Sequence, residues 1–284
     1  MSEIKKLGSL ILEASNSDQN VLIRGELGSG KEYTAQSIHN NSLRKSNTFV
    51  TLNVTTITKL TNKFSYLETA DEGTLYLDEI ANLEHDNQLN LIEFIKTKKV
   101  KDQNSLKPKH YNIRFIASTT KNLKEEVEKG RFIFELYNLL SEIEIELTAL
   151  KYFGEEIIDL ANFFILDYCK KNRKPLKQLS NGAKKLLMSY HYPQNFRELR
   201  AIIELTLMTS SSSIIYPEEI YLPKGNQAEC FFSKEKTLKE YEAEIVSHFL
   251  EKYDNKVYYV AEKLGISKNK IYNMINQGLI KLEE

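Results

Sequence analysis

A glycine-rich stretch near the start of the chain has residues that could bind phosphate. GELGSGK, residues 25–31, has the spacing G-x-x-x-x-G-K and lies between an apolar run and a helix expected over residues 31–39. Glycines let successive backbone N–H groups face phosphate oxygens, the helix N-terminus adds positive potential, and Lys31 supplies a cation. The pattern predicts a site for the phosphates of a nucleotide. The alternative is a glycine turn without function.

Two adjacent carboxylates follow a second apolar stretch, LYLDE at residues 75–79. A strand that ends in this way can present Asp78 to Mg²⁺ and Glu79 to an attacking water. Glu32 stands where phosphate loops usually carry the Ser or Thr that binds Mg²⁺, so a metal would depend on Asp78. Acidic pairs after strands are often only solvated, but a phosphate loop in the same domain favours a functional pair.

Composition sets limits on the class of protein. The 284 residues are 41% hydrophobic and carry 39 basic and 39 acidic side chains, so a nucleic-acid partner would need a local basic patch. The two cysteines, Cys169 and Cys230, are far apart, which argues against a disulfide framework or a zinc site and suits a reducing compartment. We find no signal peptide and no run long enough to span a membrane, and we expect a cytoplasmic protein.

The order of expected elements indicates an α/β fold. Apolar residues at helical spacing come first, over residues 4–12. Short strands are expected over residues 21–23, 48–53, 74–77, 112–117 and 142–147, and helices over 86–96 and 123–128 between them. Alternation of this kind predicts βαβ units and a parallel sheet.

The second half of the chain reads differently. From 152 to 208 the pattern is helical only, which is typical of a separate lid, and the polar stretch 225–236 is the best linker candidate. We therefore divide the chain into an α/β subdomain over 1–150, a helical lid over 151–224, the linker, and a last all-α domain over 237–284.

Five motifs together resemble the central AAA+ domain of NtrC-type, sigma-54-dependent activators. They are GELGSGKE (25–32), HNNSLRKSNTFVTLNV (39–54), ETADEGTLYLDEI (68–80), IRFIASTTKNL (113–123) and YPQNFREL (192–199). The similarity covers most of residues 1–224. It implies that residues 25–31 are the Walker A loop and that Asp78 and Glu79 are the Walker B pair.

The resemblance also implies the remaining site residues. Asn53 would be the partner that switches Glu79, Thr120 the first sensor and Arg197 the second sensor, with a plain surface arginine as the alternative for Arg197. We expect Asn53, Asp78, Glu79 and Thr120 to be catalytic. The residues expected to bind the nucleotide are Gly25, Glu26, Gly28, Ser29, Gly30, Lys31, Glu32 and Arg197.

Two departures from the family pattern bear on activity. The family's Gly-Ala-Phe-Thr-Gly-Ala loop, which touches the sigma factor, has no counterpart after Asn53, where Val54 to Leu60 lead almost at once towards the Walker B strand. The family's F-R-x-D-L-x-x-R-L string supplies two arginine fingers to a neighbouring subunit. Here it reads FIFELYNLL (132–140), with Ile133 and Leu139 at the two finger positions.

These departures predict weak hydrolysis. Arginine fingers contribute roughly 10³ to 10⁵ in rate in GTPases, so their loss should reduce turnover severely. Arg131 is a poor substitute for a residue at position 133 or 139, because each residue of shift turns a helical side chain by about 100°. Thr120 also replaces the usual Asn of the first sensor, which weakens the catalytic case further.

The C-terminal segment resembles a Fis-type helix-turn-helix, with its core in NKVYYVAEKLGISKNKIYNMI (255–275). Ala261 suits a close helix crossing, Gly265 a tight turn and Ser267 an N-cap. Residues 255–281 hold five lysines against one glutamate, a net charge of +4. The residues expected to contact DNA are Lys256, Lys263, Lys268, Asn269, Lys270, Tyr272 and Asn273. The alternative is a unit that only dimerises or packs.

The sequence thus predicts a transcription regulator that binds double-stranded DNA. Its AAA+ core is expected to bind ATP or ADP, with Mg²⁺ as an accompanying cation, as a structural or sensory ligand and not to remodel sigma-54 polymerase. RNA polymerase and further copies of the chain, as a dimer or a ring, are the expected protein partners. One alternative is an active ATPase that drives open-complex formation. Another is a core that has lost nucleotide binding.

Overall fold

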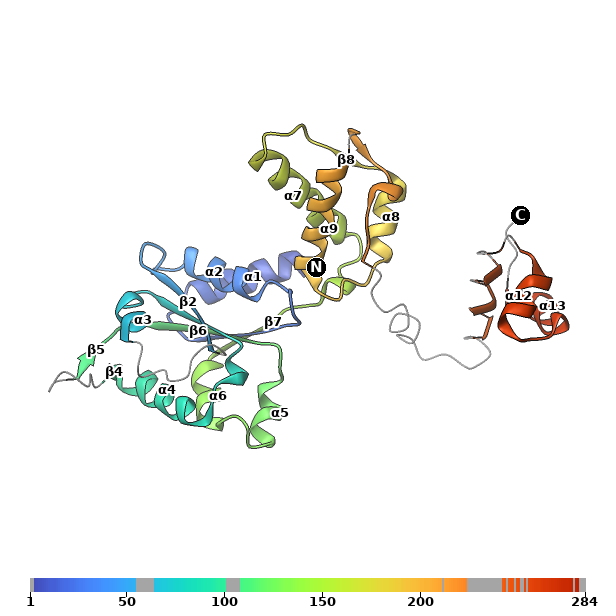
Figure 1. Cartoon of the computed structure of the whole chain (residues 1–284). Helices are drawn as coiled ribbons and strands as arrows, with labels where there is room; N and C mark the ends of the chain where they lie inside the picture. Colours follow the sequence, from blue (N-terminus) through green and yellow to red (C-terminus); the bar gives the residue numbers. More distant parts are fainter. Residues whose placement is uncertain are drawn as a thin grey trace. The chain divides into compact units, whose positions relative to one another are not determined.

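The computed structural model describes residues 3–54, 64–100, 108–210, 212–223 and 255–277, together with 242–243, 245–247, 249–250, 253 and 279–280. It divides into two compact units, Met1–Pro223 and Lys224–Glu284, which we describe separately (Figure 1). Several predictions lie outside the described residues: the linker at 225–236, most of the segment that replaces the sigma-contacting loop, Cys230 and Lys281.

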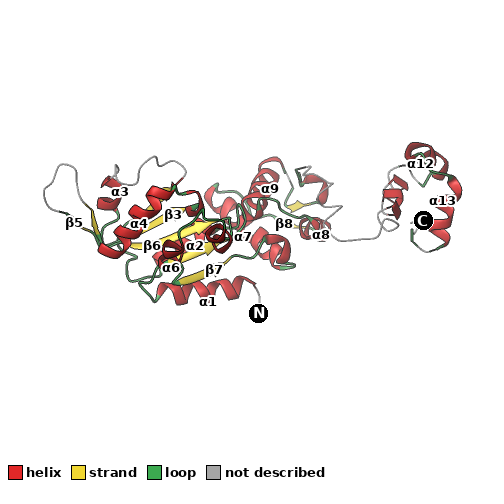
Figure 2. Ribbon diagram, turned by 90° about the horizontal axis from the view of Figure 1, so that it is seen from below, coloured by secondary structure: helices red, strands yellow, loops and turns green. Residues whose placement is uncertain are grey.

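The first unit contains a five-stranded parallel sheet with the strand order β2-β3-β6-β1-β7 (Figure 2). Its strands are β1 (Val21–Arg24), β2 (Phe49–Asn53), β3 (Thr74–Asp78), β6 (Arg114–Thr119) and β7 (Ile143–Glu146). The predicted α/β fold with a parallel sheet is thereby confirmed.

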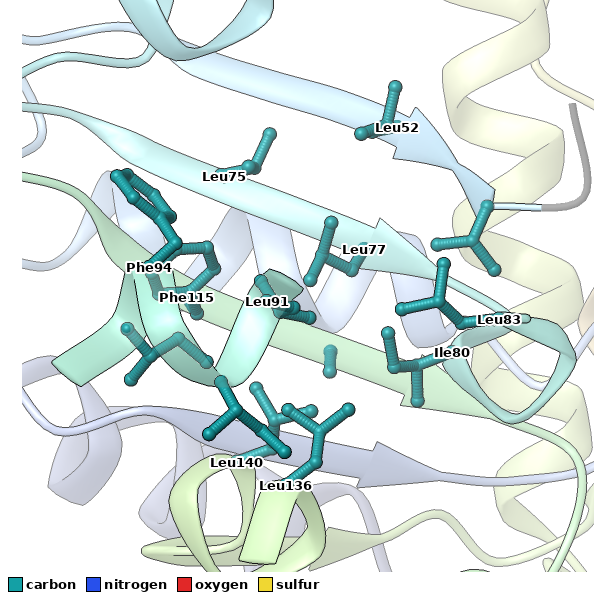
Figure 3. Close-up of a cluster of buried hydrophobic side chains, with 14 of the residues drawn as sticks. Leu52, Leu75, Leu77, Ile80, Leu83, Leu91, Phe94, Phe115, Leu136 and Leu140 are labelled. Atoms are coloured by element: carbon teal, nitrogen blue, oxygen red, sulfur yellow. The ribbon is translucent and has the colours of Figure 1, made fainter. Parts of the chain in front are cut away.

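Helices cover both faces of this sheet (Figure 1). Since side chains alternate along a strand, Tyr76 packs towards α1 (Glu3–Ser15) and α2 (Lys31–Asn40), whereas Leu75 and Leu77 face the opposite side. There they meet α4 (His85–Thr97) and α6 (Phe134–Leu140), as Figure 3 shows for Leu91, Phe94, Leu136 and Leu140. The sheet is therefore buried on both faces, and its functional side chains emerge at the strand ends.

Some short elements of this unit were not predicted. They are α3 (Phe64–Thr69), the antiparallel pair β4 (Lys99–Val100) and β5 (Lys109–His110), and the 3₁₀ turn η3 (Ile80–Asn82). The helix α5 (Leu123–Glu128) has the predicted bounds. Strands of two residues are too short to carry a hydrophobic period, so sequence patterning does not reveal them.

The second half of this unit consists mainly of helices with a core of their own. After the turn η4 (Leu150–Tyr152) come α7 (Glu156–Lys171), α8 (Asn181–Ser189) and α9 (Asn195–Thr209), which bury Ile157, Leu187 and Leu199 against one another. The expectation of helices alone was incomplete, because β8 (Gln178–Leu179) and β9 (Ile214–Ile215) form a small parallel pair. The turn η5 (Pro217–Glu219) follows.

In the second unit the described residues include α12 (Val257–Leu264) and α13 (Lys268–Asn276). Gly265 joins them with φ +63°, a conformation that glycine adopts without strain, and the Ser267 hydroxyl accepts a hydrogen bond from the Lys270 backbone N–H. Ala261 and Ile271 are buried between the helices. Among the described residues of the whole chain, no helix has the length and apolar character needed to cross a membrane.

Candidate functional site

The glycine-rich loop joins β1 to α2 in a conformation that needs glycine. Gly28 and Gly30 have φ values of +72° and +87°, and Gly30 is the N-cap of α2 with no side chain to cap the helix. The first N–H groups of a helix have no partner within the helix, so those of α2 are oriented to receive an anion. The loop therefore has the backbone geometry of a phosphate site.

Lys31 lies over this loop with its side chain only 8% exposed. Its ammonium Nζ donates to the carbonyl oxygens of Gly25 at 3.1 Å and Glu26 at 3.4 Å, and lies 3.2 Å from a carboxylate oxygen of Glu79. The buried cation is thus neutralised by Glu79. A phosphate entering the loop would compete with Glu79 for the same ammonium group.

Glu79 follows β3 in a left-handed conformation, with φ +57°, that turns its side chain back towards the loop. Its second carboxylate oxygen accepts hydrogen bonds from Thr120, from the backbone N–H at 3.1 Å and from the hydroxyl at 3.0 Å. Thr120 directly follows β6, the strand beside β3. Lys31, Glu79 and Thr120 are thus held together by three loops at the carboxyl ends of the parallel strands.

Asp78 is the last residue of β3 and is held by three side chains. Its Oδ1 accepts from the Ser118 hydroxyl at 2.8 Å and lies 3.2 Å from the Tyr76 hydroxyl, while the Asn53 amide nitrogen is 3.4 Å from Oδ2. Asn53 thus lies within the predicted cluster but beside Asp78. The role of Asn53 as the switch for Glu79 stays a prediction.

The helical lid is attached to the loop through the start of α9. The Asn195 side chain is buried, and its amide donates to the Leu27 carbonyl at 3.0 Å and to the Glu26 carboxylate at 3.2 Å, while its oxygen accepts from the Leu150 N–H at 2.8 Å. A β-carbon placed on Gly28 would lie 2.0 Å from the Gln194 carbonyl oxygen. Only glycine fits between loop and lid at this point.

The second sensor candidate lies in the same contact. The Cβ of Arg197 is 3.2 Å from where a Gly28 β-carbon would be, and the residue is exposed. Among the described residues, its guanidinium has no hydrogen-bond or ion-pair partner. Arg197 is therefore close to the loop with a cation available to an incoming anion.

A narrow cavity of about 20 Å³ opens between the loop, α1 and the lid. Leu7, Leu10, Leu147, Phe153 and Phe196 supply its apolar walls. The two phenylalanine rings meet edge to face at 5.4 Å. At the loop side, the Ser29 hydroxyl oxygen is buried and has no hydrogen-bond partner within the described part of the chain. At about 20 Å³ the cavity has room for little more than a water molecule, so a larger group would enter only after its walls move apart.

Residues 131–140, called the finger segment here, contain the two positions where the family has arginine fingers. Ile133 and Leu139 are partly buried and pack against the hydrophobic cluster below the sheet. Arg131 is exposed, but its guanidinium forms two hydrogen bonds with Glu126 at 2.7 and 2.6 Å. Both apolar finger positions therefore serve the fold, and the nearby cation is occupied within the chain.

In the second unit, α13 has one exposed face formed by Lys268, Asn269, Tyr272 and Asn273, opposite the buried Ile271. Lys270 turns away from that face and pairs with Glu242 at 2.9 Å. Lys256 and Lys263 are also exposed, and the Lys263 ammonium lies over the Tyr259 ring at 5.3 Å.

Lys268 is placed in a specific way. Its ammonium lies 3.3 Å from the centre of the exposed Tyr258 ring, and its hydrogen bond to the Tyr258 hydroxyl lowers the pKa of that hydroxyl. Lys268 and Tyr258 therefore present a cation and a hydroxyl side by side on the surface of this unit.

Sequence reasoning missed three residues of the first unit. Asn195 could have been suspected from its place two residues before Arg197, but its link to the loop depends on tertiary packing. Tyr76 and Ser118 could have been found by register, since Tyr76 precedes Asp78 by two residues on the same strand face, and Ser118 is the β6 residue level with Asp78.

Comparison with protein families finds two matches. A model described as the sigma-54 interaction domain matches residues 1–150, and a model described as the AAA+ ATPase lid domain matches residues 154–229. Together they cover the sheet, its helices and the lid. The resemblance of these regions to sigma-54 activators is thereby confirmed.

Individual relatives extend over most of the chain. A protein named limonene hydroxylase from Geobacillus stearothermophilus is 36% identical over 94% of this chain and 53% of its own length. The transcriptional regulatory protein ZraR of Salmonella typhimurium is 31% identical over 89% of this chain and 62% of its own length. The chain therefore spans only about half to three-fifths of these curated relatives.

A solved structure supports the fold. The crystal structure of NtrX from Brucella abortus in complex with ATP matches 97% of this chain and 67% of that chain, with a TM-score of 0.72 and 22% identity. At this identity the match shows a shared architecture.

Proposed function

Because the chain belongs to the sigma-54 interaction domain family, we propose that it is a DNA-binding transcription regulator whose AAA+ core binds ATP or ADP as a structural or sensory ligand. The observation that carries the proposal is the position of Lys31, an ammonium group held over a phosphate loop by two carbonyl oxygens and Glu79. A nucleotide's phosphates are the anions that such a loop is built to receive.

Further features support a nucleotide as the ligand. The Cβ of Arg197 lies beside Gly28, so its side chain starts next to the loop, and the Ser29 hydroxyl, which has no partner among the described residues, lies where the loop meets the cavity. The carboxylate of Asp78 is the kind of ligand that Mg²⁺ accepts together with phosphate oxygens. These groups would hold the phosphates and the cation at one site.

Binding without efficient hydrolysis is favoured by the finger segment. Ile133 and Leu139 stand where the family's arginines would complete a neighbour's site, and both pack into the core. Nucleotide would then act by stabilising the contact of Asn195 and Arg197 with the loop. The population of molecules whose lid contacts the loop would increase. In an oligomer, such a shift could set the spacing of the DNA-binding units.

A working ATPase of the sigma-54 activator type is the second candidate. The observation in its favour is that Lys31, Glu79 and Thr120, the side chains that a hydrolytic site would use, lie together at the carboxyl ends of the strands. In that case copies of the chain would form a ring and act on RNA polymerase, with catalytic roles for Asp78, Glu79, Asn53 and Thr120.

For DNA binding, the exposed face of α13 is the proposed reading surface. A helix that follows a tight turn and presents Lys268, Asn269 and Asn273 can enter a major groove and contact base edges. Lys256, Lys263 and Tyr272 would contact phosphates. Lys270 would have to leave Glu242 first, which weakens its case for a base contact.

The nucleotide proposal is tested with the Lys31→Ala variant. At a ligand concentration one hundred times Kd, binding stabilises a protein by about 2.7 kcal/mol. For a domain of this size that corresponds to a rise in Tm of roughly 5 to 10 °C. We expect ATP or ADP to raise the Tm of the wild type in this way and to leave Lys31→Ala unchanged.

A surface lysine provides the control. Lys129→Ala removes an exposed ammonium that pairs within one helical turn with Glu125. This variant should respond to nucleotide as the wild type does. A wild type whose Tm is indifferent to millimolar ATP would support loss of nucleotide binding and contradict the proposal.

The DNA proposal is tested by footprinting the full chain on genomic fragments with and without nucleotide. Asn269→Ala should change which sequences are protected, since a base-reading contact contributes roughly 1 to 3 kcal/mol of discrimination. Lys270→Ala, on the half-buried side of the same helix, should change sequence preference less. Unchanged footprints in Asn269→Ala would contradict the assignment of the reading face.

A further inference from the structure

Two hydroxyl groups are buried against the carboxylate of Asp78. The Tyr76 hydroxyl lies 2.8 Å from Ser118 Oγ and 3.2 Å from Asp78 Oδ1, and the Ser118 hydroxyl lies 2.8 Å from the same Oδ1. Both residues are fully buried. One carboxylate oxygen of Asp78 therefore has two potential hydrogen-bond donors, both buried.

The sheet's register explains why these groups meet. Leu77 of β3 pairs with Ala117 of β6, so Asp78 and Ser118 are level on neighbouring parallel strands and share a face. Tyr76 lies two residues back on that face, and its ring stacks on Phe49 at 6.0 Å with the hydroxyl pointing along the strand. The arrangement is fixed by backbone pairing and by packing of the ring.

The hydroxyls act as donors throughout the physiological pH range. A tyrosine hydroxyl has an ordinary pKa of about 10 and is protonated at neutral pH, and a serine hydroxyl always carries its proton there. Tyr76 therefore keeps its proton. Because it has a single proton and the contact with Ser118 is shorter, the best-formed path runs from Tyr76 to Ser118 and from Ser118 to Asp78.

We propose that Tyr76 and Ser118 are positioning residues that hold the Asp78 carboxylate for a divalent cation bound together with the nucleotide. The proposal rests on the proposed binding of ATP or ADP at Lys31. A carboxylate that is oriented by hydrogen bonds loses less freedom when it contacts a hydrated cation, and partners of this kind change metal affinity by roughly 10- to 100-fold when removed.

The geometry makes a specific prediction about redundancy. In Tyr76→Phe the Ser118 hydroxyl still donates to Asp78, and in Ser118→Ala the Tyr76 hydroxyl can donate directly across 3.2 Å. Each single change should therefore weaken cation binding only about two- to threefold, whereas the double variant should weaken it roughly tenfold or more. A purely structural role would not produce this dependence on both hydroxyls.

The test is a Mg²⁺ titration of ATP binding, followed with a fluorescent ATP analogue on the full chain. The double variant should need about ten times more Mg²⁺ for half-maximal binding, excess Mg²⁺ should restore wild-type binding, and affinity in EDTA should match the wild type. Tyr192→Phe is the matched control, since Tyr192 is a buried tyrosine of the lid whose hydroxyl donates to the Leu187 carbonyl at 2.7 Å.

Two results would overturn the inference. One is a double variant with the wild-type Mg²⁺ requirement. The other is a loss of affinity in EDTA as large as the loss in Mg²⁺, which would mean that the hydroxyls support the loop instead of the cation ligand. A wild type that binds no ATP at any Mg²⁺ concentration would instead refute the proposed nucleotide binding.

Discussion

The phosphate loop and the finger segment, residues 131–140, use their side chains in opposite ways. Around the loop, Lys31, Glu79 and Thr120 are polar groups that bond to one another at the end of the sheet. In the finger segment, Ile133 and Leu139 turn into the hydrophobic cluster, and Arg131 is paired with Glu126.

The difference between the two regions distinguishes nucleotide binding from nucleotide hydrolysis. A phosphate loop needs backbone N–H groups and one cation, all supplied within a single chain. Fast hydrolysis in AAA+ rings also needs a cation from a neighbouring subunit, and this chain has no arginine at the two expected positions, 133 and 139. Loss of the second requirement would leave the first intact, and the proposed regulator that binds nucleotide without fast turnover rests on this separation.

The largest expected effect comes from closing the space between loop and lid. In Gly28→Ala, the new β-carbon would lie 2.0 Å from the Gln194 carbonyl oxygen at a φ of +72°, so the lid must move away. We expect at least about a tenfold loss of ATP affinity, roughly 1.4 kcal/mol, together with lower stability. Isothermal titration and denaturant unfolding measure the two effects.

Gly130, next to the finger segment, provides the control for that experiment. Its φ is +67°, and a β-carbon there would meet nothing within 4 Å. Gly130→Ala should therefore lose only the roughly 1 to 2 kcal/mol of the left-handed backbone and keep its ATP affinity. Equal losses of affinity in the two variants would remove the special role of the contact between loop and lid.

A smaller effect concerns His39, at the far end of α2 from the phosphate loop. Burial lowers the pKa of His39, and the positive charge of Arg114 lowers it further. Below the ordinary pKa of 6.5 the unfolded chain takes up a proton that the folded chain does not, so stability should fall as the pH drops through that value. His39→Gln should remove this part of the pH dependence.

The free energy of unfolding between pH 7.5 and 5.5 checks this expectation. If His39→Gln and the wild type lose stability in parallel over this range, the buried imidazole is not the group responsible.

The smallest effect on ATP turnover is expected at Arg131. The Arg131 side chain is 56% exposed, but that of Glu126 is only 9% exposed, so removing the cation leaves a shielded carboxylate without its partner. Arg131→Ala should therefore lower the Tm modestly and change ATP turnover only slightly, because its guanidinium is held within the chain. A strong loss of turnover in this variant would identify Arg131 as a finger and would narrow the difference between the two regions.

Much of the fold and of the site could be read from local patterns. Short stretches rich in apolar residues, 21–23, 74–77 and 112–117, marked β1, β3 and β6, and glycine spacing with a following helix marked the loop. These signals are local, because strands buried on both faces are continuous apolar runs and phosphate loops need glycine at fixed positions.

Contacts that depend on tertiary packing could not be predicted in this way. That Glu79 pairs with Lys31 follows from the turn after β3, and that Asn195 reaches the Leu27 carbonyl follows from the angle of the lid. The Tyr76 and Ser118 hydroxyls required a strand register that composition does not specify. The ion pair of Lys270 with Glu242 likewise depends on how α13 packs.

The most direct test of a nucleotide-holding core is ATP turnover per subunit, measured over a wide range of protein concentration in saturating Mg²⁺ and ATP. The account predicts a low rate that does not rise with concentration and does not exceed that of Lys31→Ala, although the wild type binds ATP and the variant does not. Turnover that increases as subunits associate, and that disappears in Lys31→Ala, would contradict it and identify a working ATPase.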